Sequence, residues 1–107
     1  MYALAGFRYF VFNERNGRIQ LVIGGLVVVS GIVFRLSRME WCVLLICIMA
    51  VTCLEMVNTS IERVCAMLSA EYHPMIKVIK DVAAAAVLWA AVLSAIIGAI
   101  IFLPHIF

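Results

Sequence analysis

Three long apolar runs occupy most of this chain, and they constrain its fold more than any other feature of the sequence. The runs cover residues 19–34, 41–57 and 82–103. A helix needs about 20 apolar residues to cross a bilayer, so we expect the two shorter runs to extend into their flanks. The chain is 67% hydrophobic, whereas water-soluble domains are about half apolar. The sequence therefore predicts one all-α membrane domain over residues 1–107, with three transmembrane helices.

The basic residues predict how these helices are oriented. Arg35 and Arg38 lie between the first and second runs, whereas the other six lysines and arginines precede the first run or separate the second from the third. Because cytoplasmic segments carry the excess of basic residues, we expect the N-terminus to lie in the cytoplasm. The net charge is only +2, and no basic stripe indicates nucleic-acid binding.

The N-terminal segment, residues 1–16, begins with an apolar stretch at residues 1–12, which is too short to span a membrane and is interrupted by Arg8. Its aromatic residues are Tyr2, Phe7, Tyr9, Phe10 and Phe12. Since aromatic rings favour the membrane–water boundary, we expect an amphipathic helix that lies in the interface. The Asn16-Gly17 pair that follows predicts a turn before the first transmembrane helix.

The second transmembrane helix is expected to continue past the membrane. Between residues 58 and 71, apolar residues recur at helical spacing, at Ile61, Val64, Cys65 and Leu68. Pro74 cannot prolong that helix but can begin another, and we expect Pro104 to end the third transmembrane helix.

Small residues and cysteines add two expectations. Ala86, Ala90, Ser94 and Gly98 recur every four residues, a ridge that favours close packing against another helix and hence oligomerisation.

The four cysteines include no C-x-x-C pair. Because most of them sit in apolar helix, we expect free thiols.

Polar residues suited to catalysis or binding gather where the second run ends. Glu55, Asn58 and Glu62 stand at i, i+3 and i+7, which places them on one face of a helix. Lys80 and Asp81 open the third run. An ionisable group at membrane depth is costly unless it is paired or functional, so Glu55 predicts a functional site.

These residue types match the needs of ATP-dependent phosphoryl transfer, which depends mainly on positioning and charge neutralisation. Mg²⁺ favours one or two carboxylates together with phosphate oxygens and water, and Glu14 and Glu62 are the candidates. Lys80 can reach a phosphate as a point charge. Glu55 suits a general base for a lipid hydroxyl. The sequence thus predicts an enzyme that acts on a lipid.

Simpler roles for the same carboxylates remain open at this point. Glu62 has Arg63 beside it and is also compatible with a solvated helix charge. Glu14 is compatible with an interfacial carboxylate that pairs with Arg15 or Arg18. Exposed ion pairs of this kind are common and weak.

Three segments carry a resemblance to a known family. They read E-M-V-N-T-S-I-E at residues 55–62, E-Y-H-P at 71–74 and K-V-I-K-D-V-A-A at 77–84, and Asn13-Glu14 stands upstream. This pattern resembles the prokaryotic diacylglycerol kinase and undecaprenol kinase family, and the likeness extends over nearly the whole chain. The resemblance implies a small three-span enzyme of the bacterial cytoplasmic (inner) membrane, assembled as a homotrimer with active sites shared between subunits.

The resemblance also implies a reaction and roles for individual residues. The γ-phosphate of MgATP would pass to a lipid alcohol, undecaprenol or diacylglycerol. Glu55 matches the catalytic base, Glu14 and Glu62 match the Mg²⁺ ligands, and Asn58 matches a supporting amide. The implied nucleotide contacts, besides Glu14 and Glu62, are Tyr2, Glu71, His73, Lys80 and Asp81. The implied partners are ATP, the lipid alcohol, membrane lipids and further copies of the chain, with no nucleic acid.

The chain departs from the family pattern in two places. Ala66 stands where the family motif carries an aspartate, and the N-terminal surface helix is expected to be shorter than in other members. A catalytically lapsed scaffold of the same family is therefore one alternative. A small drug/proton antiporter is another, although that class needs four spans. The His73-Pro74 pair and residues 101–104 resemble the undecaprenol kinase branch more than the enterobacterial diacylglycerol kinase branch.

Overall fold

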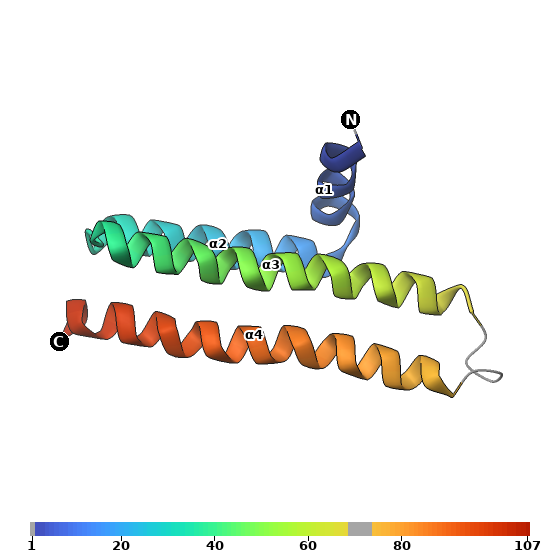
Figure 1. Ribbon diagram of the computed structural model, residues 1–107. Coiled ribbons are helices and arrows are strands. Elements are labelled where there is room, and N and C mark those ends of the chain that lie inside the picture. The colour runs from blue at the N-terminus through green and yellow to red at the C-terminus, as the bar shows by residue number, and fades with distance from the viewer. Residues whose placement is uncertain (1, 69–73) are drawn as a thin grey trace.

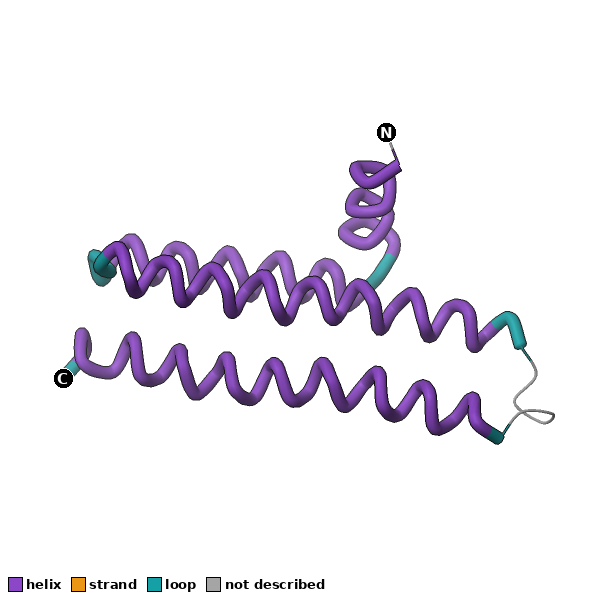
Figure 2. Tube along the Cα trace, in the orientation of Figure 1, coloured by secondary structure: helices purple, strands orange, loops and turns teal. Residues whose placement is uncertain are grey.

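The computed structural model describes residues 2–68 and 74–107. In these ranges the chain forms the helices α1 (Tyr2–Asn13), α2 (Arg15–Val33), α3 (Arg38–Ala66) and α4 (Met75–Ile106). Helices α2, α3 and α4 lie lengthwise beside one another, and α1 stands steeply against the start of α2 (Figures 1 and 2). Helix α3 packs against both α2 and α4, whereas α1 packs against α2.

Three of the described helices, α2, α3 and α4, are long and apolar enough to cross a membrane. This confirms the prediction of a multi-pass membrane protein with an all-α fold. The longest dimension of the chain is 54 Å, whereas the hydrocarbon core of a bilayer is about 30 Å thick. Helix α3 has 29 residues and, at about 1.5 Å per residue, is longer than that core. It continues past residue 57, as predicted, but it ends at Ala66 rather than near residue 71. The prediction that a new helix begins at Pro74 is also confirmed, since Pro74 is the N-cap of α4.

The corner between α1 and α2 differs from the prediction. Asn16 and Gly17 do not form a turn, because α2 already begins at Arg15 and α1 ends at Asn13. The expected helix over residues 1–16 is therefore shorter than predicted. A Cβ atom at position 17 would collide with the backbone oxygen of Phe10. The glycine thus serves close packing of two helices rather than a turn.

The turn between α2 and α3 is closed by two capping motifs. Arg35 adopts a left-handed conformation with φ of 54°, and the N–H of Leu36 donates to the carbonyl of Gly31 over 3.2 Å. This is the pattern of a Schellman motif at a helix end. Ser37 and Glu40 then form a capping box at the start of α3, which satisfies backbone donors that the helix leaves unpaired.

Side chains at this same end of the molecule fasten α4 to the other helices. Leu36, Leu44 and Ile101 form a small buried cluster. The rings of Phe34 and Phe102 meet edge to face with centroids 5.9 Å apart, an arrangement that aromatic pairs favour. His105 Nε2 also lies 3.1 Å from Glu40 Oε2. The contacts at this end, which is remote from Glu55 along α3, therefore stabilise the packing of the helices.

Two further predictions concern the last helix and the cysteines. The prediction that Pro104 ends the third transmembrane helix is wrong, because α4 continues to Ile106. A proline this close to a helix end removes a single hydrogen bond, and the N–H of Phe107 still donates to the carbonyl of Leu103 over 3.0 Å. All four cysteines are free, as expected.

Candidate functional site

Helix α3 carries the predicted polar stripe on one face. Glu55 and Asn58 are buried, and Glu62 is exposed. Asn58 Nδ2 donates a hydrogen bond to Glu62 Oε1 over 3.1 Å, one turn further along the helix. Thr59 lies beside them and is also buried. The i, i+3, i+7 spacing therefore brings the three predicted residues onto one surface, with the deepest carboxylate nearest the membrane-spanning part.

The start of α2 meets this stripe through two side-chain contacts. Asn16 Nδ2 donates to Glu55 Oε1 over 2.9 Å, across 39 residues of sequence. Glu14, which precedes the first residue of α2, accepts a hydrogen bond from Arg63 Nε over 2.9 Å. The Nη2 atom of Arg63 also lies 2.7 Å from the same Glu14 Oε1. These contacts place Glu14 against α3 and join Asn16, in the first turn of α2, to Glu55 on α3.

The two buried carboxylates, Glu55 and Glu14, have partners of different charge. Glu55 is 8% exposed, and within the described chain it takes its hydrogen bond from a neutral amide and pairs with no cation. A buried carboxylate without a counter-charge is costly and retains its capacity to accept a proton. Glu14 is 9% exposed and is paired with a guanidinium. Their surroundings thus favour Glu55 as the base.

The simpler ion pairs considered for these carboxylates do not form as expected. Arg18 donates to the carbonyl oxygen of Phe12 over 2.9 Å instead of binding Glu14. Arg63 binds Glu14 rather than its neighbour Glu62. Folding, and not proximity in sequence, therefore selects the partners.

The donor atoms at the stripe fit the chemistry of Mg²⁺. Carboxylate and amide oxygens are hard ligands of the kind that Mg²⁺ favours. The Asn58 Oδ1 and Thr59 Oγ1 atoms are buried with no hydrogen-bond partner. In the described ranges, no group of three acidic, histidine or cysteine side chains is close enough to hold a metal by itself. Since Mg²⁺ is commonly held by one or two carboxylates plus phosphate oxygens and water, these residues fit an ion that arrives with a nucleotide.

Apart from Glu62, none of the described residues predicted to contact the nucleotide lies on α3. Tyr2 begins α1 and is 98% exposed, while Lys80 and Asp81 are exposed on α4. Asp81 accepts a hydrogen bond from Lys77 Nζ over 2.7 Å. Within the described residues, 2–68 and 74–107, no hydrogen bond or ion pair joins these side chains to the α3 stripe. The remaining two, Glu71 and His73, lie outside the described residues.

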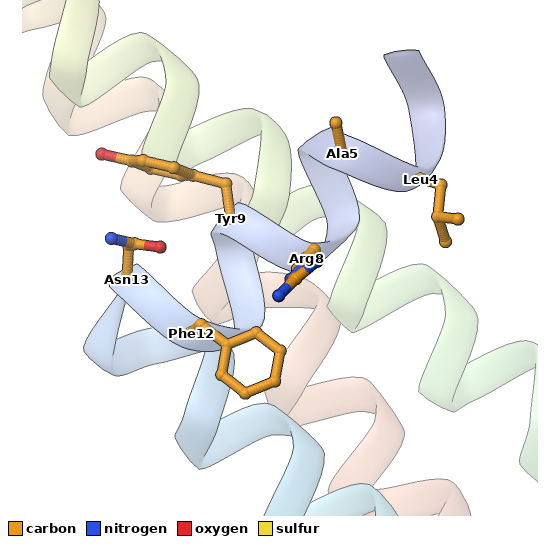
Figure 3. Close-up of a pocket in the computed structure, with 6 residues that line it drawn as sticks. All are labelled: Leu4, Ala5, Arg8, Tyr9, Phe12 and Asn13. Atoms are coloured by element: carbon orange, nitrogen blue, oxygen red, sulfur yellow. The ribbon is translucent and has the colours of Figure 1, made fainter. Parts of the chain in front are cut away.

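Two of the hollows beside the first helix differ in their position relative to the polar stripe. One, of about 590 Å³, is formed by α1 alone and is lined by Leu4, Ala5, Arg8, Tyr9, Phe12 and Asn13. Figure 3 shows Tyr9 and Asn13 pointing to the same side of α1, with Phe12 on another side. The other, of about 430 Å³, lies between α1 and α3 and has Glu14, Thr59 and Arg63 in its wall. The second hollow therefore belongs to the candidate site.

Sequence reasoning missed three members of this site. Thr59 stands four residues after Glu55, so helical spacing could have placed it on the stripe. Asn16 was hidden by the turn interpretation of the Asn-Gly pair. No sequence signal distinguishes Arg63 as the partner of Glu14, because that contact depends on how α2 docks on α3.

Comparisons with known proteins identify the family of the chain. A family model described as prokaryotic diacylglycerol kinase matches residues 1–102. The undecaprenol kinase of Bacillus subtilis is 38% identical over 94 residues, which are 88% of this chain and 76% of the relative. The diacylglycerol kinase of Synechocystis is 36% identical over 104 residues, 96% of this chain but only 59% of the relative. No solved structure matches significantly. The chain therefore belongs to the prokaryotic diacylglycerol kinase family.

Proposed function

We propose that this protein transfers the γ-phosphate of MgATP to the hydroxyl of a membrane lipid alcohol, undecaprenol or diacylglycerol. Family membership supports a lipid kinase. The observation that carries the proposal is the buried Glu55 carboxylate, which a neutral amide holds inside a membrane helix. Such a group is expensive to bury and is best explained by a role in proton transfer.

Glu55 acts as the general base in this proposal. Asn16 occupies Oε1, so Oε2 is the atom that accepts the proton of the lipid hydroxyl. The hydroxyl oxygen forms a bond to the γ-phosphorus, and the bond between that phosphorus and the bridging oxygen of ADP breaks. The products are a lipid phosphate and ADP, and the accepted proton later leaves Glu55 to solvent.

Glu14 and Glu62 would hold Mg²⁺, with Asn58 orienting the Glu62 carboxylate through its amide. When bound, Mg²⁺ neutralises charge on the phosphates during transfer. Lys80 would bind a phosphate, and Tyr2, Asp81, Glu71 and His73 would contact the rest of the nucleotide. These assignments follow the family resemblance and the donor chemistry of the stripe.

A homotrimer with shared sites is part of the proposal. In the parts of the chain that are described, Tyr2, Lys80 and Asp81 make no hydrogen bond or ion pair with the α3 stripe of the same chain, which supports a site completed by a second copy. The small-residue ridge on α4 also favours helix association. The excess of basic residues supports a cytoplasmic N-terminus and hence a site at the cytoplasmic face of the inner membrane.

Neither alternative function gains support. A drug/proton antiporter would need four spans, whereas the described helices include three candidates. A lapsed scaffold would have no use for a buried, cation-free Glu55. Among the two lipid alcohols, residues 73–74 and 101–104 and the similarity to an undecaprenol kinase favour undecaprenol.

A transfer assay tests the proposal. The purified protein in detergent or bilayers receives labelled ATP and Mg²⁺, with diacylglycerol and undecaprenol offered side by side. We expect label in one of the two lipid phosphates, with undecaprenol favoured. Absence of label from both acceptors would contradict the proposed function.

A further inference from the structure

We infer that Arg63 is a positioning residue that competes with a divalent cation for Glu14, so that cation binding releases its guanidinium toward the phosphates of the nucleotide. The inference rests on the proposed role of Glu14 as a metal ligand. Arg63 itself is not part of the site that the sequence and the family resemblance predict.

The contact geometry shows how Arg63 substitutes for a cation. Its Nε and Nη2 atoms both approach one carboxylate oxygen of Glu14, at 2.9 and 2.7 Å. The positive group therefore stands at an oxygen that a metal ion would use. A guanidinium and a divalent cation at the same oxygen repel each other, so each weakens the binding of the other.

The two partners are fixed to different degrees. The side chain of Glu14 is only 12% exposed, whereas that of Arg63 is 63% exposed. Backbone packing at Phe10 and Gly17 holds the corner that carries Glu14. The arginine can therefore swing outward on its flexible stem while the carboxylate stays in place, and the exposure of the guanidinium to solvent lets the pair exchange.

A released guanidinium would remain beside the site. Arg63 and Glu14 both line the hollow of about 430 Å³ between α1 and α3, together with the buried Thr59. A planar guanidinium binds phosphate oxygens through paired N–H groups. Arg63 would thus pair with Glu14 before the metal binds and bind phosphate oxygens of the nucleotide afterwards.

The test measures metal binding directly, with Mn²⁺ as the probe and electron paramagnetic resonance of free Mn²⁺ as the readout. The purified, intact protein is compared with Arg63→Gln, Arg63→Lys, Glu14→Gln and, as a control, Arg15→Gln. Arg15 adjoins Glu14 in sequence and makes no side-chain hydrogen bond or ion pair in the described chain. Its substitution removes the same charge without breaking the contact.

We expect Arg63→Gln to bind Mn²⁺ about two- to five-fold more tightly than Arg15→Gln, as suits the loss of one competing ion pair. Arg63→Lys should shift the affinity in the same direction by less, and it serves as the test if the glutamine variant fails to fold. Binding of Mn²⁺ with a non-hydrolysable ATP analogue should instead weaken in Arg63→Gln. A purely structural role would not produce these opposite changes.

Two outcomes of the Mn²⁺ measurement would contradict the inference, and they differ in which residue they exclude. Equal or weaker Mn²⁺ binding in Arg63→Gln relative to Arg15→Gln, with binding lost in Glu14→Gln, would overturn the role of Arg63 alone. Unchanged Mn²⁺ binding in Glu14→Gln would remove Glu14 from the proposed metal site, and the inference about Arg63 with it.

Discussion

Asn16 on α2 donates a hydrogen bond from Nδ2 to Oε1 of Glu55 on α3, over 2.9 Å. This contact joins the first turn of one membrane helix to the buried carboxylate of another. The amide carries no charge, so it orients the carboxylate without neutralising it. A cation in the same place would hold Glu55 more firmly but would compete with the proton that a general base must accept.

Replacement of Asn16 by alanine should lower kcat about ten-fold and leave the KM for ATP nearly unchanged. The reason is that Glu55 loses the partner that fixes its orientation, and small errors in placing a catalytic group are costly. Steady-state kinetics with saturating lipid would measure both constants. Ser30→Ala is the matched control, because it removes a hydrogen bond within α2 that does not reach α3. A kcat equal to that of the control would show that the amide does not position Glu55.

Gly17→Ala should destabilise the corner between α1 and α2. The added methyl group meets the backbone of Phe10, which cannot move aside as a flexible side chain could. Overpacking of this kind costs about 1–3 kcal/mol. Unfolding in mixed micelles would measure the loss, with Gly6→Ala as control because a Cβ there meets nothing within 4 Å. Equal stabilities of the two variants would contradict the close contact.

Glu62→Gln should raise the Mg²⁺ concentration needed for half-maximal transfer by about ten-fold, since the variant loses one of two proposed carboxylate ligands. Asn58 can still bond to the new amide, so the local fold should persist. The measurement is a Mg²⁺ titration of the transfer rate at fixed ATP. An unchanged Mg²⁺ requirement would indicate that Glu62 is only a surface charge.

Much of the fold follows from patterns that act locally or through the membrane. The three apolar runs predict the three long helices, because a membrane allows few other ways to satisfy backbone polar groups. The prediction failed at Asn16-Gly17 and at Pro104. At the first position, glycine serves helix packing, and at the second, a nearby helix end lowers the cost of proline.

The site could be predicted only where its residues share one helix. Helical spacing places Glu55, Asn58 and Glu62 together. The partners of Glu14 and Glu55 could not be predicted, because Asn16 and Arg63 reach them through the docking of α2 on α3. The predicted nucleotide residues remain a prediction, since they lie on other helices or outside the described chain.

The most direct test of the account is the effect of Glu55→Gln on phosphate transfer from labelled ATP to lipid. The change keeps the size and a hydrogen-bonding oxygen at the position but removes the base. Transfer should fall by at least about 100-fold, with nucleotide binding and assembly retained. Glu40→Gln is the control, since Glu40 lies at the opposite end of α3 beside His105. Transfer by Glu55→Gln at the rate of the Glu40→Gln control would contradict the claim that Glu55 is the catalytic base.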